Sequence, residues 1–230
     1  MDKAKPLILA VETATKVGSL ALVAPGRVVG QVFLKSSLTH DAALLGALQQ
    51  LLKKCRKKID DVDLMAVSQG PGSFTGLRVG ISFARAIAQA RDIQVIPVST
   101  LDALASQIKH SRGVPVCALL DANKGEVWAC FYREKGKSLQ RKGKPFNATP
   151  SELALKIKEK TILLGEGWEK YRDALKEILG KKAVEDYPLS QKGRADASSV
   201  GVLAHELMKK KKAGNLLEVL PLYIRKPIIG

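Results

Sequence analysis

The sequence predicts an α/β protein built from two similar small lobes, and three observations support this fold class. The chain has 230 residues, 46% of them hydrophobic, which is long for one core and short for two full domains. Apolar runs of strand length alternate with longer segments of helical periodicity. The order of elements then begins again at Gly113. We therefore expect one lobe over residues 1–110 and a second lobe over residues 111–230.

The first lobe is expected to follow the element order βββαβαβα. A polar turn and the Pro25-Gly26 turn separate three opening strands, and Thr39 can act as the N-cap of the first helix. Short apolar runs then alternate with amphipathic helices. The expected elements cover residues 6–11, 18–24, 27–34, 39–55, 61–68, 76–91, 93–98 and 99–109.

The second lobe is expected to open with three strands again. Its first helix is marked by a capping box of Thr149 and Glu152, with Pro150 at the first helical position. The expected elements cover residues 114–120, 127–133, 137–142, 149–158, 161–164 and 169–179, a last helix from 196 or 198 to 212, and a terminal strand over 220–224. No repeat is visible residue by residue, so the internal duplication rests on element order alone.

The composition points to a cytoplasmic globular protein and leaves the role of its basic charge open. No apolar run reaches the roughly 18 residues of a membrane helix, and the run over 7–11 is too short for a signal peptide core. Cys55, Cys117 and Cys130 lack the paired spacing of a zinc or redox site. The net charge of +16 indicates either a basic face for a nucleic acid or another polyanion, or an ordinary solvated surface.

Two polar loops in the first lobe are candidates for chemistry. In the segment 12–15, between the first two strands, hydroxyls and amides can cradle a phosphate, although an ordinary hairpin turn needs the same residue types. The segment 70–80, GPGSFTGLRVG, lacks the lysine of a Walker A loop, because Leu77 follows its glycine, and its glycines do not have dinucleotide-binding spacing. Ser73 or Thr75 can cap the helix that follows.

The helices over 39–55 and 76–91 carry more apolar or small surface than one core-facing stripe needs. Small residues recur every fourth position in the second helix, so another helix can approach this face closely, from the same chain or from a partner subunit. Two glycines weaken a helix by roughly 2 kcal/mol relative to alanine, a cost that close packing must offset. The residues proposed for a partner interface are His40, Leu44, Leu48, Leu51, Gly76, Gly80, Ala84 and Ala88.

The sequence contains no pattern for metal binding or nucleophilic catalysis. His40 has no second ligand one helical turn later, because Ala43 and Leu44 cannot bind a metal, and His110 and His205 stand alone. There is no GxSxG nucleophile motif. We therefore expect no catalytic residue and no metal site.

Several motifs in one order make the chain resemble a known family. They are ILAVETAT near the start, GPGSFTGLRVG, VSTLDALA over 98–105, DANKGEVWAC from Asp121, GEGW from Gly165 and the terminal PLYIRK. In order and spacing they resemble the TsaB (YeaZ) family of tRNA threonylcarbamoyladenosine biosynthesis subunits over nearly the whole chain. The resemblance implies the actin/hexokinase-like (ASKHA) fold with duplicated βββαβαβα lobes.

The resemblance also implies a function. It implies a non-catalytic cytoplasmic subunit that pairs as a heterodimer with TsaD, the related catalytic subunit, in transferring threonylcarbamoyl to adenosine 37 of ANN-decoding tRNAs. TsaE would be a further partner. The helices over 40–55 and 76–91 would contact TsaD or a second copy in a homodimer. The assembled complex would hold the tRNA, with help from the basic surface.

Two departures from the related enzymes argue against activity of the chain alone. The catalytic relative binds metal through two histidines one turn apart, whereas only His40 is present here. Active members of the fold carry Asp-x-Gly-Thr in their first phosphate loop, whereas this loop has Glu12 in place of the aspartate and Ala14 in place of the glycine. We therefore expect no ATP or ADP cofactor. The positions at which a nucleotide would bind are Glu12, Thr13, Thr15, Asp121 and Gly165.

Three functions remain open on the sequence. A scaffold subunit would show no turnover alone and would associate tightly with TsaD. A small independent kinase or acyltransferase of the same fold would bind nucleotide and a divalent metal. A direct tRNA-binding module would lose affinity steeply with added salt. The missing ligands and the altered phosphate loop favour the scaffold subunit.

Overall fold

The chain folds into two compact units, each built on a five-stranded sheet. The computed structural model describes residues 6–34, 40–108, 110–136, 138–184, 193–210 and 219–222, without the side chains of 40–42 and 209–210. Unit 1 comprises residues 1–100 and 196–222, and unit 2 comprises residues 101–195 and 223–230. None of the helices in the described ranges has the length and apolarity needed to span a membrane.

The sheet of unit 1 has the strand order β3-β2-β1-β4-β5. Its strands are β1 (Ile8–Glu12), β2 (Ser19–Ala24), β3 (Arg27–Phe33), β4 (Leu64–Gly70) and β5 (Gln94–Ser99). The first three form the expected antiparallel meander, and β4 and β5 extend the sheet parallel to β1. Because β1 lies at the centre with both faces covered, all five residues of its sequence ILAVE are buried.

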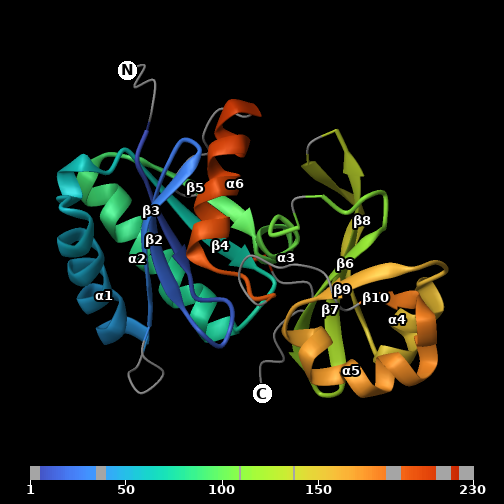
Figure 1. The fold of residues 1–230 in the computed structure, drawn as a ribbon. Helices are drawn as coiled ribbons and strands as arrows, with labels where there is room; N and C mark the ends of the chain where they lie inside the picture. Colours follow the sequence, from blue (N-terminus) through green and yellow to red (C-terminus); the bar gives the residue numbers. More distant parts are fainter. Residues whose placement is uncertain are drawn as a thin grey trace. The chain divides into compact units, whose positions relative to one another are not determined.

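Helices cover both faces of this sheet (Figure 1). They are α1 (His40–Cys55), α2 (Phe74–Arg91) and α6 (Ala197–Lys210). On one face, α1 and α2 share a core with Leu9 and Met65 of the sheet. On the other face lies α6, whose Gly201 packs so closely on Val23 that an added Cβ would collide with it. The small residue therefore lets the last helix lie directly on the sheet.

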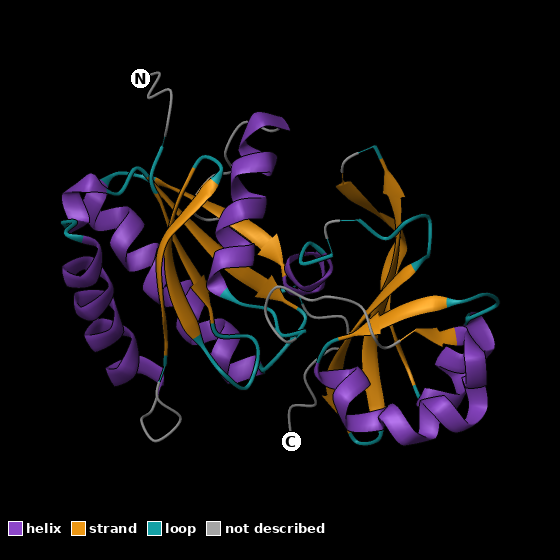
Figure 2. Ribbon diagram, viewed as in Figure 1, coloured by secondary structure: helices purple, strands orange, loops and turns teal. Residues whose placement is uncertain are grey.

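Unit 2 repeats this plan on a second sheet, whose strands are orange in Figure 2. Its strand order is β10-β9-β6-β7-β8. Its elements are α3 (Thr100–Ala105), β6 (Val116–Asn123), β7 (Glu126–Lys135), β8 (Ser138–Ala148), α4 (Pro150–Lys156), β9 (Thr161–Leu164), α5 (Glu166–Leu179) and β10 (Ala183–Val184). Leu153 of α4 and Trp168 of α5 belong to the core on one face of the sheet. Leu101 and Leu104 of α3 belong to the core on the other face.

The boundaries of the units differ from the lobes expected over 1–110 and 111–230. Along the chain, α3 follows the last strand of unit 1, yet from Leu101 onward it belongs to unit 2. In turn, α6 follows the last strand of unit 2 but packs on the sheet of unit 1. Element order places each helix with the strand before it, and only tertiary packing reveals the exchange.

The predicted element types are largely confirmed, and most differences lie at element ends. The capping box of α4 is formed: the amide of Thr149 donates to the Glu152 carboxylate at 2.8 Å, and the amide of Glu152 donates to the Thr149 hydroxyl at 3.3 Å. The helix α2 begins two residues early because Ser73 caps it. Residues 220–222 form no strand, and residues 223–224 lie outside the described ranges.

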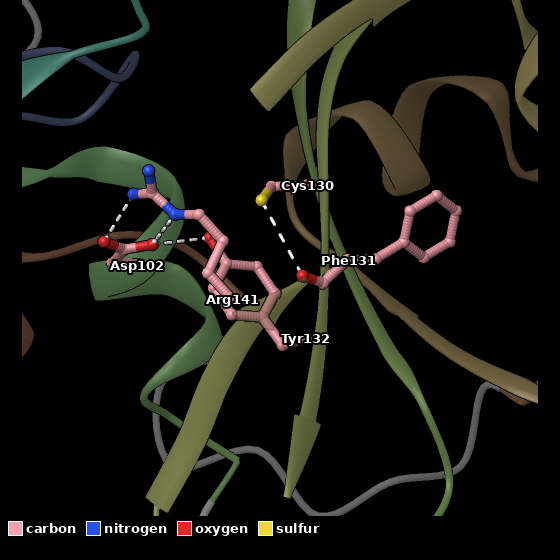
Figure 3. A network of polar contacts seen from close by, with 5 residues as sticks. All are labelled: Asp102, Cys130, Phe131, Tyr132 and Arg141. Atoms are coloured by element: carbon pink, nitrogen blue, oxygen red, sulfur yellow. Dashed lines mark hydrogen bonds and ion pairs between the residues drawn. The ribbon is translucent and has the colours of Figure 1, made fainter. Parts of the chain in front are cut away.

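A network of polar side chains fastens α3 to the sheet of unit 2 (Figure 3). Asp102 accepts hydrogen bonds from the Tyr132 hydroxyl at 2.7 Å and from Arg141 Nε at 3.1 Å. Burial, together with the nearby Asp102 carboxylate, raises the pKa of Tyr132 well above its ordinary value. The hydroxyl therefore keeps its proton and remains a donor, which orients α3 on the strands.

Candidate functional site

The loop between β1 and β2 is closed by the side chain of Glu12, which is fully buried. Its Oε1 accepts hydrogen bonds from the amides of Ala14 at 2.7 Å and Thr15 at 3.1 Å. Its Oε2 accepts one from the Thr15 hydroxyl at 2.7 Å. The hydroxyl of Ser68, on β4, donates to Oε1 at 3.5 Å. The Glu12 carboxylate therefore holds the turn together by accepting hydrogen bonds from the residues that follow it.

This loop has the chemistry of an anion cradle. Neighbouring backbone amides and a hydroxyl converge on one negatively charged group, an arrangement that elsewhere binds phosphate. Here the group is the Glu12 carboxylate, so the amides of Ala14 and Thr15 already have a charged internal partner. A phosphate can take these amides only if the carboxylate moves away.

The glycines of α2 pack against the same loop. The Thr13 hydroxyl donates to the Gly76 carbonyl at 2.7 Å, and the Ser73 amide donates to the Ala14 carbonyl at 2.8 Å. A Cβ added at Gly76 would collide with the Thr13 carbonyl oxygen, and one at Gly80 would collide with the Thr13 hydroxyl. The bare face of α2 therefore allows the helix to sit directly on the loop.

Most residues proposed for a partner interface are buried within unit 1, and their contact with a partner stays a prediction. Of the two sequence interpretations, packing within the same chain applies to the small-residue face of α2. The leucine stripe of α1 likewise faces the sheet of unit 1. The side chain of His40 lies outside the described part of the chain. The residues of this set that are buried are Leu44, Leu48, Leu51, Gly76, Gly80, Ala84 and Ala88.

The outward faces of α1 and α2 expose other apolar side chains. Leu45 on α1 is 58% exposed, and Phe74 at the start of α2 is 38% exposed. The guanidinium of Arg78 lies over the Phe74 ring, 3.9 Å from its centroid. Aromatic residues and arginine are enriched at protein interfaces. The extra apolar surface expected on α1 is therefore present, and it is formed by Leu45 and not by the leucines proposed for the interface.

In unit 2, β6 carries near its end an aspartate that is paired within the unit. Lys170 Nζ, on α5, lies 3.0 Å and 2.8 Å from the two carboxylate oxygens of Asp121, and the Asn123 amide donates to one of them at 3.0 Å. The hydrogen bond to Asp121 raises the pKa of Lys170. Gly165 caps α5 with φ of 109°, and an added Cβ would collide with the Leu119 carbonyl oxygen.

The five positions suggested for a nucleotide therefore fall into two groups. Glu12, Thr13 and Thr15 share one loop of unit 1, and Asp121 and Gly165 belong to unit 2. Sequence reasoning did not identify the partners of these groups. The contacts of Lys170 with Asp121 and of Ser68 with Glu12 span 49 and 56 residues, and no local pattern marks them.

Among the described residues, no group of three or more His, Cys, Asp or Glu side chains is placed to hold a metal ion. Cys55, Cys117 and Cys130 are free. Burial raises the pKa of Cys117 well above its ordinary value, so this thiol stays protonated and is a poor ligand or nucleophile.

Comparisons with known protein sequences all find proteins of one tRNA modification, threonylcarbamoyladenosine. The family model described as TsaD, tRNA N6-adenosine threonylcarbamoyltransferase, matches residues 29–227. The tRNA threonylcarbamoyladenosine biosynthesis protein TsaB of Escherichia coli is 32% identical over 74% of this chain and 75% of that protein. The TsaB protein of Bacillus subtilis is 26% identical over 95% of this chain and 93% of that protein.

Comparisons with solved structures point the same way. YeaZ from Pseudomonas aeruginosa superimposes with a TM-score of 0.79 at 26% identity, covering 95% of this chain and 99% of that chain. The ROK hexokinase of Thermus thermophilus has a TM-score of 0.52 at 10% identity, covering 89% and 100% of the two chains. The second likeness concerns the fold alone and confirms the predicted actin/hexokinase-like class. The sequence and structural matches together show that the chain belongs to the TsaB (YeaZ) family of tRNA threonylcarbamoyladenosine biosynthesis proteins.

Proposed function

We propose that this chain is a non-catalytic subunit that pairs with a TsaD-type transferase in the complex that places threonylcarbamoyl on tRNA. Its family membership supports a role in this pathway. The match of residues 29–227 to the TsaD model supports a partner of related fold. TsaE and a second copy of the chain are further proposed partners, and the assembled complex is proposed to hold the tRNA.

The observation that carries the non-catalytic role is the position of the Glu12 carboxylate. It accepts the hydrogen bonds of the β1–β2 loop amides that a phosphate would need. Displacing it would sacrifice hydrogen bonds to a buried charged group, each contributing about 1.5–3 kcal/mol. In unit 2, Lys170 similarly pairs with Asp121. Both contacts support our proposal that the chain uses no ATP or ADP cofactor.

Isothermal titration calorimetry tests the non-catalytic role. ATP or ADP is titrated with magnesium into the isolated chain, and we expect no heat of binding. A parallel assay follows release of ADP. Saturable binding accompanied by turnover would overturn the proposal and favour an independent kinase or acyltransferase of the same fold.

The outward faces of α1 and α2 are the proposed contact with the TsaD-type partner. Leu45 and Phe74 expose apolar area there, and each Å² removed from water contributes about 25 cal/mol. Arg78 over Phe74 adds the arginine–aromatic pair that is frequent among energetically dominant interface residues. The buried stripes of the same helices fix the direction in which these side chains project.

Size-exclusion chromatography with light scattering tests this contact. The full chain and its TsaD-type partner should co-elute as a complex, and Leu45→Glu should abolish that complex. Leu155→Glu is the matched control, because Leu155 is 71% exposed on α4 of unit 2 and should leave assembly intact. Failure of the wild-type chain to form any complex would overturn the proposed function. If Leu45→Glu and Leu155→Glu lost the complex to the same extent, including not at all, only the assigned face would be overturned.

A further inference from the structure

A hollow of about 200 Å³ lies on the sheet of unit 2, where α4 ends. Phe131 and Arg133 line it from β7, Lys142 lines it from β8, and Lys158 lines it from the segment after α4. Phe131 lies directly opposite Lys142 in the antiparallel pair, so both belong to the same face of the sheet. Because α4 has only 7 residues and ends at Lys156, it leaves this part of the face open.

Positive charge dominates the hollow. A single carboxylate, that of Glu159, stands among its lining residues, and it pairs with Arg133. Lys156 Nζ lies 5.3 Å from the centroid of the Phe146 ring. Within the described ranges, the side chains of Lys142 and Lys158 form no ion pair. The cationic lining residues are Arg133, Lys142, Lys156 and Lys158.

Phe131 and Ile157 give the hollow an apolar floor, and Phe146 packs against Phe131 outside the lining. The rings of Phe131 and Phe146 stack with centroids 5.9 Å apart and an interplanar angle of 23°. Ile157 is buried in the core cluster against which both rings pack. Figure 3 shows Phe131 and Tyr132 on opposite sides of β7, so the Tyr132 hydroxyl belongs to the Asp102 network behind the sheet. Charges above an apolar floor attract an anion more strongly than fully solvated lysines do.

The size of the hollow decides which anion suits it. Pockets that enclose a whole small-molecule ligand commonly measure about 300–1,000 Å³, so this hollow is too small for a complete nucleotide. A single phosphate group of a polymer can enter while the rest of the chain runs over the surface. Lysines supply point charges for such phosphates, and each neutralised phosphate releases counter-ions.

We propose that this hollow binds a backbone phosphate of the tRNA on which the complex acts. The inference rests on the proposed function, since that function brings tRNA to the assembly. It assigns part of the net charge of +16 to RNA binding and places that part on unit 2. Lys142 and Lys158 supply the main charge, because Arg133 and Lys156 already have partners within the unit.

Fluorescence anisotropy of a labelled, unmodified tRNA transcript tests this proposal with the full chain. Affinity is measured from about 50 to 300 mM KCl for the wild type, for Lys142→Gln/Lys158→Gln and for a control. The control Lys181→Gln/Lys182→Gln removes the same charge from exposed lysines elsewhere in unit 2. Unchanged thermal unfolding of both variants shows that they fold.

The expected result is a loss specific to the hollow. Losing the two lysines that neutralise this one phosphate should weaken tRNA binding roughly tenfold at low salt and reduce the slope of log K against log[KCl] by about 0.7–0.9. Equal affinities of the hollow variant and the control would overturn the proposal. A wild-type chain that binds inorganic phosphate but has no affinity for tRNA would also overturn it. A third outcome separates the two proposals. If the hollow variant loses tRNA binding but the wild-type chain forms no complex with a TsaD-type partner, the proposed function is rejected and the RNA site is retained.

Discussion

Adding one methyl group at Gly80 tests whether α2 is held against the β1–β2 loop of its own chain. The new Cβ would collide with the Thr13 hydroxyl, and the next nearest atom, Thr13 Cβ, lies 3.4 Å away. Overpacking of this kind costs about 1–3 kcal/mol, whereas alanine in place of glycine inside a helix contributes about 1 kcal/mol. We expect Gly80→Ala to lower the free energy of unfolding by about 1 kcal/mol.

Removing the colliding hydroxyl should reverse the sign of this effect. Thr13→Ala alone loses the hydrogen bond to the Gly76 carbonyl, which contributes about 1 kcal/mol. In that background the new methyl at position 80 makes only an ordinary contact with the Cβ of residue 13. Gly80→Ala should then stabilise the protein by about 1 kcal/mol, so the double-mutant cycle should give a coupling of about 2 kcal/mol.

Urea unfolding followed by circular dichroism measures the cycle. Gly46→Ala on α1 is the control, because a Cβ there meets no atom within 4 Å and should stabilise both backgrounds by about 1 kcal/mol. If Gly80→Ala stabilised the wild type as much as Gly46→Ala does, α2 would not be held against Thr13. The bare face of α2 would then be free for a partner subunit.

Three further predictions concern other parts of the chain. The Gly113 amide, with His110 and Ser111, lowers the pKa of Glu134. The ionised Glu134 side chain therefore stabilises the fold above its ordinary pKa near 4.5, and this stabilisation is lost as pH falls through the lowered pKa. In acid unfolding curves, the difference between wild type and Glu134→Gln should therefore shrink below about pH 4.5. Thr149→Ala should cost about 1 kcal/mol in urea unfolding by removing the cap of α4, and an unchanged midpoint would contradict that role. Gly201→Leu should cost about 2 kcal/mol by pushing α6 away from Val23, whereas no loss of thermal stability would show that α6 does not rest on the sheet of unit 1.

Features that are local in the chain could be predicted from the sequence. The capping box at Thr149 and Glu152 involves residues three apart, and its geometry follows from their types alone. The buried strands of both sheets are marked by short apolar runs, because a strand covered on both faces needs apolar residues at successive positions. The motif order from ILAVETAT to PLYIRK then identified the family, which element periodicity alone does not do.

Features that depend on distant partners could not be predicted in this way. The spacing of Gly76 and Gly80 identifies a bare helical face, but the group that fills it is Thr13, whose hydroxyl bonds to a carbonyl 63 residues away. The exchange of α3 and α6 between the units is invisible to element order for the same reason. Glu12 stood out as a replacement for aspartate, yet its folding back onto the amides of Ala14 and Thr15 required the loop geometry.

The role of Glu12 as an internal anion leads to a prediction of chemical rescue. Glu12→Ala leaves the buried amides of Ala14 and Thr15 without an acceptor, and we expect a loss of about 3 kcal/mol in stability. The deleted atoms amount to an acetate, so formate or acetate can enter the vacated space and accept the same hydrogen bonds. At ten times its Kd, such an ion should restore about 1.4 kcal/mol, or about 3–5 °C in Tm.

The rescue must separate occupancy of the loop from general salt effects. Chloride at equal ionic strength is the control, and the wild-type chain should respond to formate and chloride alike because its own carboxylate fills the loop. If formate stabilised Glu12→Ala no more than chloride does, the loop would not be an anion cradle. The physical argument for a non-catalytic subunit would then fail. It holds that Glu12 blocks a phosphate site, and amides without affinity for an anion would form no such site.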